Sequence, residues 1–142
     1  MRIARASLHQ WEEPCLSGER GSGTVFFTGC PLGCVFCQNY NIAAGLQGVP
    51  DGQGANRVTG TELTTEELAD VLLKLEDLGA HNINLVTPTH FVPAIVPALE
   101  RAKELGLRLP VVYNTGTYET VETLRMLDGL VDIWLPDFKY VS

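Results

Sequence analysis

The sequence contains little positive charge. Its 142 residues include 10 lysines and arginines against 17 aspartates and glutamates, which gives a formal net charge of −7. No run of basic residues occurs that would build the positively charged face typical of nucleic-acid binders. We therefore expect no nucleic-acid partner, whereas cationic and neutral small molecules stay open as ligands.

Long hydrophobic runs are missing as well. The longest apolar stretch, residues 91–99, is interrupted by Pro93 and Pro97. It is far shorter than the roughly 20 residues that a membrane-spanning helix needs. The N-terminus carries Arg2 and Arg5 without an apolar core behind them, so we expect no signal peptide. These features predict a cytoplasmic protein that does not associate with membranes.

Cysteine is rare but clustered. Three of the four cysteines, Cys30, Cys34 and Cys37, follow one another with the spacing CxxxCxxC. Thiols stay reduced in the cytoplasm, and such crowding indicates metal ligands rather than disulfides. Thiolates are soft ligands that suit iron–sulfur clusters and zinc. An electron-transfer cluster normally has four cysteine ligands, so three would leave one iron open to a substrate. Gly29 and Gly33 allow the backbone to wrap closely around such a group.

A structural zinc ion is the alternative for this cysteine loop. Zinc would need a fourth ligand, for which Cys15, His81 and His90 are the candidates. Zinc motifs usually consist of two separated pairs of ligands rather than one triplet, so the pattern favours a cluster. Cys15 lies in a loop-forming segment, and we expect it to be a free thiol.

The rest of the chain alternates between strand and helix patterns. Apolar periodicity and turn residues predict strands over 23–28, 82–87, 110–114 and 131–139, and helices over 65–78, 91–105 and 117–127. Residues 1–22 are interpreted as an irregular N-terminal extension and 44–61 as a glycine-rich loop. Helices between consecutive strands imply a parallel sheet. We expect an α/β fold with about four parallel strands and helices outside, which is too few strands to close a barrel.

Polar residues follow three further predicted strands. In parallel α/β barrels the functional residues lie at these carboxyl ends. The candidates are Thr87, Thr89, His90, Asn114, Thr115, Asp137 and Lys139. Thr89 and Thr115 are equally well explained as residues that cap the following helices. Asp137 and Lys139 would share one strand face, where two charges are costly unless paired or liganded. A surface ion pair at a frayed strand end is the alternative for them.

The cysteine loop resembles that of the radical S-adenosylmethionine superfamily, in which an aromatic residue precedes the last cysteine as Phe36 does here. A wider string resembles homologues of pyruvate formate-lyase activating enzyme: Trp11-Glu12-Glu13-Pro14, Ser17-Gly18, residues 21–27 and Cys37-Gln38-Asn39. This resemblance covers nearly the whole chain but only the N-terminal half of such a protein. It implies a partial (βα) barrel over residues 23–142, either a truncated protein or the product of a short gene.

The resemblance implies a [4Fe-4S] cluster on Cys30, Cys34 and Cys37 whose fourth iron binds S-adenosylmethionine. One electron then cleaves the sulfonium to methionine and a 5′-deoxyadenosyl radical, which abstracts hydrogen from a substrate. It further implies an electron donor such as flavodoxin or ferredoxin, and a glycyl radical enzyme as the protein activated. A non-catalytic metal-binding module, or a remnant that holds a cluster without cleaving the cofactor, stays open.

By the same resemblance, a set of polar and aromatic residues would contact S-adenosylmethionine: Phe36, Asn39, Thr87, Thr89, His90, Asn114, Thr115, Asp137 and Lys139. Many relatives have Gly-Gly-Glu where this sequence has Thr87-Pro88-Thr89-His90, so the contacts to the amino group are assigned here by position alone. Asp137 and Lys139 match an Asp-x-Lys of the activating enzymes. The role of His9, Trp11, Glu12 and Glu13 is left undecided between a cover for the cluster and a partner surface.

Overall fold

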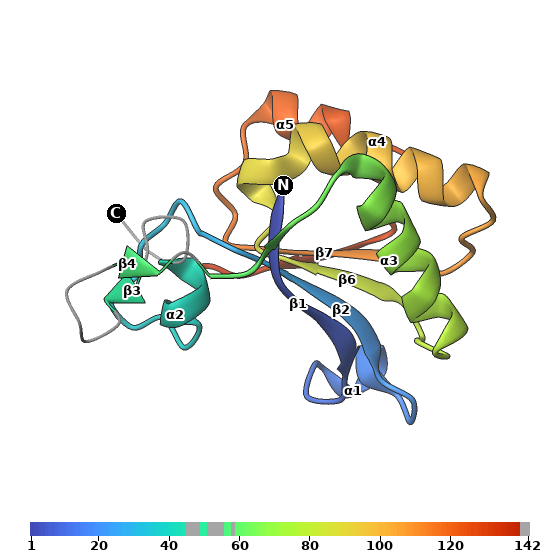
Figure 1. The fold of residues 1–142 in the computed structure, drawn as a ribbon, viewed down its shortest axis with the longest axis horizontal. Helices are drawn as coiled ribbons and strands as arrows, with labels where there is room; N and C mark the ends of the chain where they lie inside the picture. The colour runs from blue at the N-terminus through green and yellow to red at the C-terminus, as the bar shows by residue number, and fades with distance from the viewer. Residues whose placement is uncertain (45–48, 51–55, 58, 140–142) are drawn as a thin grey trace.

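The protein is built on one six-stranded sheet. A computed structural model describes residues 1–44, 49–50, 56–57 and 59–139. The strand order is β5-β1-β2-β6-β7-β8 (Figure 1). The strands are β1 (Arg2–His9), β2 (Ser22–Phe27), β5 (Thr61–Glu62), β6 (Ile83–Val86), β7 (Val111–Thr115) and β8 (Ile133–Pro136).

Four neighbouring strands, β2, β6, β7 and β8, run parallel, while β1 is antiparallel to both β2 and β5. The α/β class and the four parallel strands expected from the sequence are confirmed. Among the described residues the sheet is open, with β5 and β8 at its edges. Its completion into a barrel stays a prediction.

Three helices cover one face of the sheet (Figure 1): α3 (Thr65–Asp77), α4 (Val92–Glu104) and α5 (Val121–Met126). The core lies between this face and the helices. Its fully buried side chains include Leu68 and Leu72 of α3, Ile95 and Leu99 of α4, and Val25, Ile83, Leu85 and Val111 of the strands. Burying each such side chain contributes about 1.5–3 kcal/mol, so the helices hold the parallel strands firmly in place.

The first strand was not predicted. Residues 2–9 carry little of the β-branched and aromatic pattern by which strands are recognised. The strand forms because it pairs with β2, from Ile3 opposite Phe27 to His9 opposite Ser22, and because Ile3 joins the core. The N-terminal segment is therefore part of the main sheet. The division into an extension over 1–22 and half of a barrel over 23–142 stays a prediction.

One predicted element boundary is confirmed and two differ. Helix α3 begins as expected at a capping box: Thr64 Oγ1 accepts a hydrogen bond from the Glu67 amide (3.2 Å), and the Glu67 side chain accepts one from the Thr64 amide (2.8 Å). Helix α5 begins only at Val121, because Thr120 is its N-cap. Strand β8 ends at Pro136, so Asp137 and Lys139 follow the strand.

The remaining elements are small: α1 (Pro14–Ser17), α2 (Tyr40–Ala43), the paired strands β3 (Val49–Pro50) and β4 (Asn56–Arg57), and the 3₁₀ helix η1 (Thr89–Phe91). The loop expected over 44–61 falls in part outside the described residues. Within it the structure places β3, β4 and the beginning of β5. In Figure 1 the cysteine loop runs from the end of β2 to α2, at one end of the sheet.

Candidate functional site

A cavity of about 770 Å³ opens at the carboxyl ends of the parallel strands. The three clustered cysteines line it together with most of the other predicted residues: Phe36, Asn39, Thr87, Asn114, Thr115, Asp137 and Lys139. Thr89 and His90 are the two predicted residues that do not line it. The structure thus brings the cysteine loop and three strand ends to one concave surface, which is the usual place for a ligand in an α/β fold.

The cysteine loop is held by its own backbone and by α2. The Cys37 amide donates to the Cys34 carbonyl (3.1 Å), and the Gly29 amide donates to the Ile42 carbonyl (2.9 Å). Gly33 has a φ of +58° and nothing within 4 Å of the place where a Cβ would lie. The three cysteines are free thiols and partly exposed. They are therefore available as ligands at the wall of the cavity.

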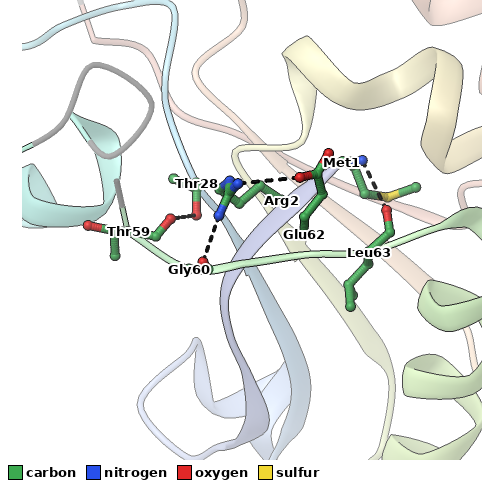
Figure 2. Close-up of polar contacts among 7 residues, drawn as sticks. All are labelled: Met1, Arg2, Thr28, Thr59, Gly60, Glu62 and Leu63. Atoms are coloured by element: carbon green, nitrogen blue, oxygen red, sulfur yellow. Dashed lines mark hydrogen bonds and ion pairs between the residues drawn. The ribbon is translucent and has the colours of Figure 1, made fainter. Parts of the chain in front are cut away.

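Thr28, two residues before Cys30, fixes the beginning of this loop. Its amide donates to the Arg2 carbonyl (3.0 Å) and its hydroxyl to the Thr59 carbonyl (3.2 Å), as Figure 2 shows for the latter. Its own carbonyl lies 2.8 Å from His90 Nε2. Because a carbonyl only accepts, Nε2 carries the proton. His90 thus contacts the beginning of the cysteine loop and does not line the cavity.

The strand ends are linked to one another by backbone hydrogen bonds. The Thr87 amide donates to the Asn114 carbonyl (3.0 Å), and the Asp137 amide donates to the Thr115 carbonyl (2.8 Å). Thr87 has a φ of +54°, a conformation that threonine rarely adopts. Strained residues of this kind occur at ligand sites, where the surrounding structure holds them in place.

Thr89 and Thr115 point their hydroxyls at a residue that the sequence analysis missed. Oε1 of Glu119 accepts hydrogen bonds from Thr89 (2.6 Å), Tyr113 (3.2 Å) and Thr115. Burial, reinforced by the Glu119 carboxylate, raises the pKa of Tyr113 well above its usual range, so the phenol stays protonated and donates. Nothing in the spacing of Glu119 distinguishes it from a solvated loop carboxylate.

Asp137 and Lys139 form an ion pair with each other at 2.5 Å, on the rim of the cavity. Their side chains are 58% and 37% exposed, so neither charge is buried in an apolar interior. An exposed pair of this kind contributes little to stability. Both charges stay within reach of a ligand in the cavity.

Part of the remaining wall of the cavity is apolar. Phe26, Phe27, Leu32, Ile42 and Val86 line it and were not predicted as site residues. Phe26 and Val86 occupy equivalent positions on adjacent parallel strands. Side chains alternate between the two faces of a strand, so Phe26 and Val86 would have been identified if the sheet face that lines the cavity had been known in advance. His9, Trp11, Glu12 and Glu13 also line the cavity, on the side of the N-terminal segment.

The residues considered as a fourth zinc ligand lie elsewhere. His81 contacts the Arg20 amide (3.3 Å) and guanidinium (3.2 Å), and Cys15 is exposed on α1. Within the described residues, no three His, Cys, Asp or Glu side chains converge on a point that one metal ion would occupy. The donor set beside the cavity is three free thiols from one short loop, the ligand type that iron–sulfur clusters take.

Fold and site together define a class of protein: an α/β protein whose cysteine loop and polar strand ends face one cavity, suited to a thiolate-bound cluster and a second ligand beside it. Residues 24–138 match the radical SAM superfamily, and the chain belongs to this superfamily. Its members generally use a [4Fe-4S] cluster and S-adenosylmethionine.

The chain is also similar to the uncharacterized protein MJ0674 of Methanocaldococcus jannaschii. The two are 36% identical over 135 residues, which cover 94% of this chain and 36% of that protein. The chain thus spans about a third of the length of this curated relative. No solved structure gives a significant match.

In the part of the chain that the structure describes, every helix is too short or too polar to cross a membrane.

Proposed function

We propose that Cys30, Cys34 and Cys37 hold a [4Fe-4S] cluster and that the cavity beside them binds S-adenosylmethionine. One observation carries the proposal: the three free thiols and the polar ends of β6, β7 and β8 line the same cavity. When bound, the cluster supplies the electron that cleaves S-adenosylmethionine to methionine and a 5′-deoxyadenosyl radical. Membership of the superfamily supports this chemistry.

The chain's own residues bind and orient the cofactor in this proposal. Asn114 offers an amide, and Asp137 with Lys139 offers paired charges, to the polar groups of S-adenosylmethionine. Phe36 lines the same cavity, and the apolar side chains of Phe26 and Val86 would shield the reacting atoms from water. Asn39 is the N-cap residue of α2, and its side chain makes no capping hydrogen bond. Its side-chain amide is therefore also available to the ligand.

The reaction that follows radical formation is the finer part of the proposal. Installation of a glycyl radical on a partner enzyme, an electron donor such as flavodoxin or ferredoxin, and a cytoplasmic setting are supported by the sequence resemblance alone. The chain corresponds to about a third of its curated relative, so residues outside this chain would contribute to substrate choice in a protein of that length.

Anaerobic reconstitution with iron and sulfide tests the cluster. The wild-type chain is expected to develop the broad thiolate-to-iron absorption near ~400 nm, a band that zinc does not give. Cys34→Ala should lose the band and the bound iron, while Cys15→Ala, a matched change at a cysteine outside the cavity, should keep both. Equal iron loss in the two variants would show that the ligands are misassigned.

A second assay separates an enzyme from a metal-binding module. The reconstituted chain is reduced with dithionite in the presence of S-adenosylmethionine, and 5′-deoxyadenosine is quantified. A fully loaded protein that forms no 5′-deoxyadenosine would contradict the catalytic part of the proposal for this chain and leave the binding part standing.

A further inference from the structure

Glu119 collects three hydroxyl groups at one carboxylate oxygen. The donors are Thr89 of η1 (2.6 Å), Tyr113 within β7 (3.2 Å) and Thr115 at the end of β7. A carboxylate forms stronger hydrogen bonds than a neutral acceptor, and the bonds of such a network reinforce one another. Glu119 is half-buried and is not among the residues that line the cavity.

The network continues from Glu119 to the end of β8. Thr115 Oγ1 also accepts from the Thr117 amide (3.1 Å), and Thr117 Oγ1 donates to the Asp137 carbonyl (2.9 Å). Thr117 has a φ of +60°, a left-handed conformation that is unfavourable for a residue with a side chain. The loop after β7 therefore needs these hydrogen bonds to keep its shape.

The same loop contacts the cysteine loop. A Cβ on Gly116 would run into Leu32 Cδ1, and Lys139 Cγ lies 4.0 Å from the same position. The Asn114 carbonyl, two residues earlier, accepts the Thr87 amide. The ends of β6, β7 and β8 and the cysteine loop are thus packed into one unit, and Glu119 is the point where its side-chain hydrogen bonds meet.

We infer that Glu119 is a positioning residue for the cofactor cavity. It fixes the ends of β7 and β8 so that Asn114 and Asp137 face the ligand, and Thr89 acts through Glu119 rather than on the cofactor. This inference rests on the proposed function and deepens it, because it assigns the geometry of the S-adenosylmethionine side of the cavity to a residue outside that cavity. A purely structural carboxylate would stabilise the fold without changing ligand affinity at full cluster content.

The test compares Glu119→Gln with Glu122→Gln in the reconstituted chain. Glu122 lies exposed in the first turn of α5, so the control makes the same chemical change without these contacts. Iron per chain and the dissociation constant for S-adenosylmethionine, by equilibrium dialysis, are measured for each. Glu119→Gln should keep its iron and bind S-adenosylmethionine about tenfold more weakly, the effect of one weakened hydrogen bond to a charged group. Glu122→Gln should equal the wild type.

Thr89→Val probes the second half of the inference. It removes the hydroxyl and keeps the shape of the side chain. The double variant with Glu119→Gln should bind no more weakly than Glu119→Gln alone, because both changes break the same network. Additive losses would show that Thr89 contacts the cofactor independently and would overturn this part.

Two outcomes would overturn the role of Glu119, and a third would refute the proposed function instead. Unchanged affinity in Glu119→Gln would refute it outright. Loss of iron in step with the loss of affinity would make the residue structural only. A wild-type chain with a full cluster that binds no S-adenosylmethionine would instead refute the proposed function on which the inference rests, and the wild-type arm alone identifies that case.

Discussion

Gly60 is an exposed residue whose replacement by alanine is expected to be unusually costly. It has a φ of +91°, and its carbonyl accepts a hydrogen bond from Arg2 Nη1 (2.8 Å), as Figure 2 shows. A Cβ at this position would overlap the Ile3 carbonyl oxygen and lie 2.6 Å from Thr28 Oγ1. A β1 backbone atom cannot move aside without disturbing the pairing of that strand.

The cost has two parts. The left-handed conformation costs about 1–2 kcal/mol once a side chain is present. Forcing an extra carbon against the backbone adds about 1–3 kcal/mol. We therefore expect Gly60→Ala to lower the free energy of unfolding by about 2–5 kcal/mol, a large share of the roughly 5–15 kcal/mol that holds a domain together.

Two glycines in the same conformation provide matched controls. Gly79 has a φ of +88° with its nearest neighbouring atom at 3.9 Å, and Gly129 has a φ of +72° with nothing within 4 Å. Alanine at either position carries the backbone cost without the overlap. Urea unfolding of the apoprotein should place Gly60→Ala at least about 1 kcal/mol below both controls. Equal losses in all three variants would refute the argument from the close contact with β1.

Three further changes test other parts of the structure. Tyr113→Phe should abolish a loss of stability at alkaline pH. The raised pKa keeps the folded phenol protonated above about pH 10, where the unfolded chain releases its proton. The free energy of unfolding of the wild type, measured by urea titration, should therefore fall by up to about 1.4 kcal/mol per pH unit relative to the variant. Asn84→Leu should raise the free energy of unfolding by about 1–2 kcal/mol, because the fully buried Asn84 amide has no hydrogen-bond partner among the described residues; a decrease would indicate that a bound water satisfies it. Thr64→Ala should cost about 1 kcal/mol by removing the cap of α3, read from the melting temperature.

The parts of the site that sequence reasoning located are those that local patterns specify. The cysteine spacing singles out the three thiols that line the cavity, and polar residues directly after β6 and β7 are placed by the rule that parallel strands end at one edge of a sheet. Thr87 and Asn114 lie at this edge and line the cavity together. Asp137 and Lys139 also line it, although β8 ends before them and they pair in solvent.

The parts that sequence reasoning did not locate depend on distant partners. β1 is a strand because it pairs with β2, and its own residues carry little strand preference. His90 was expected to face the ligand, but its imidazole contacts the carbonyl of Thr28, 62 positions away in the chain. Thr89 was weighed as a cofactor contact or a helix cap, yet its hydroxyl donates to Glu119. Spacing carries no information about such contacts.

The cysteine loop needs this distant support because it has little structure of its own. Cys30, Cys34 and Cys37 are only partly buried, and Val35 between them is 98% exposed. A flexible loop would lose conformational entropy on wrapping a cluster, at about 1–2 kcal/mol per ordered residue. Thr28 is anchored by hydrogen bonds to β1, His90 and residue 59, and Leu32 packs against Gly116. These contacts remove part of the entropy loss before any ligand binds. The contacts that the cysteine spacing does not predict are therefore those that hold the proposed ligands in place.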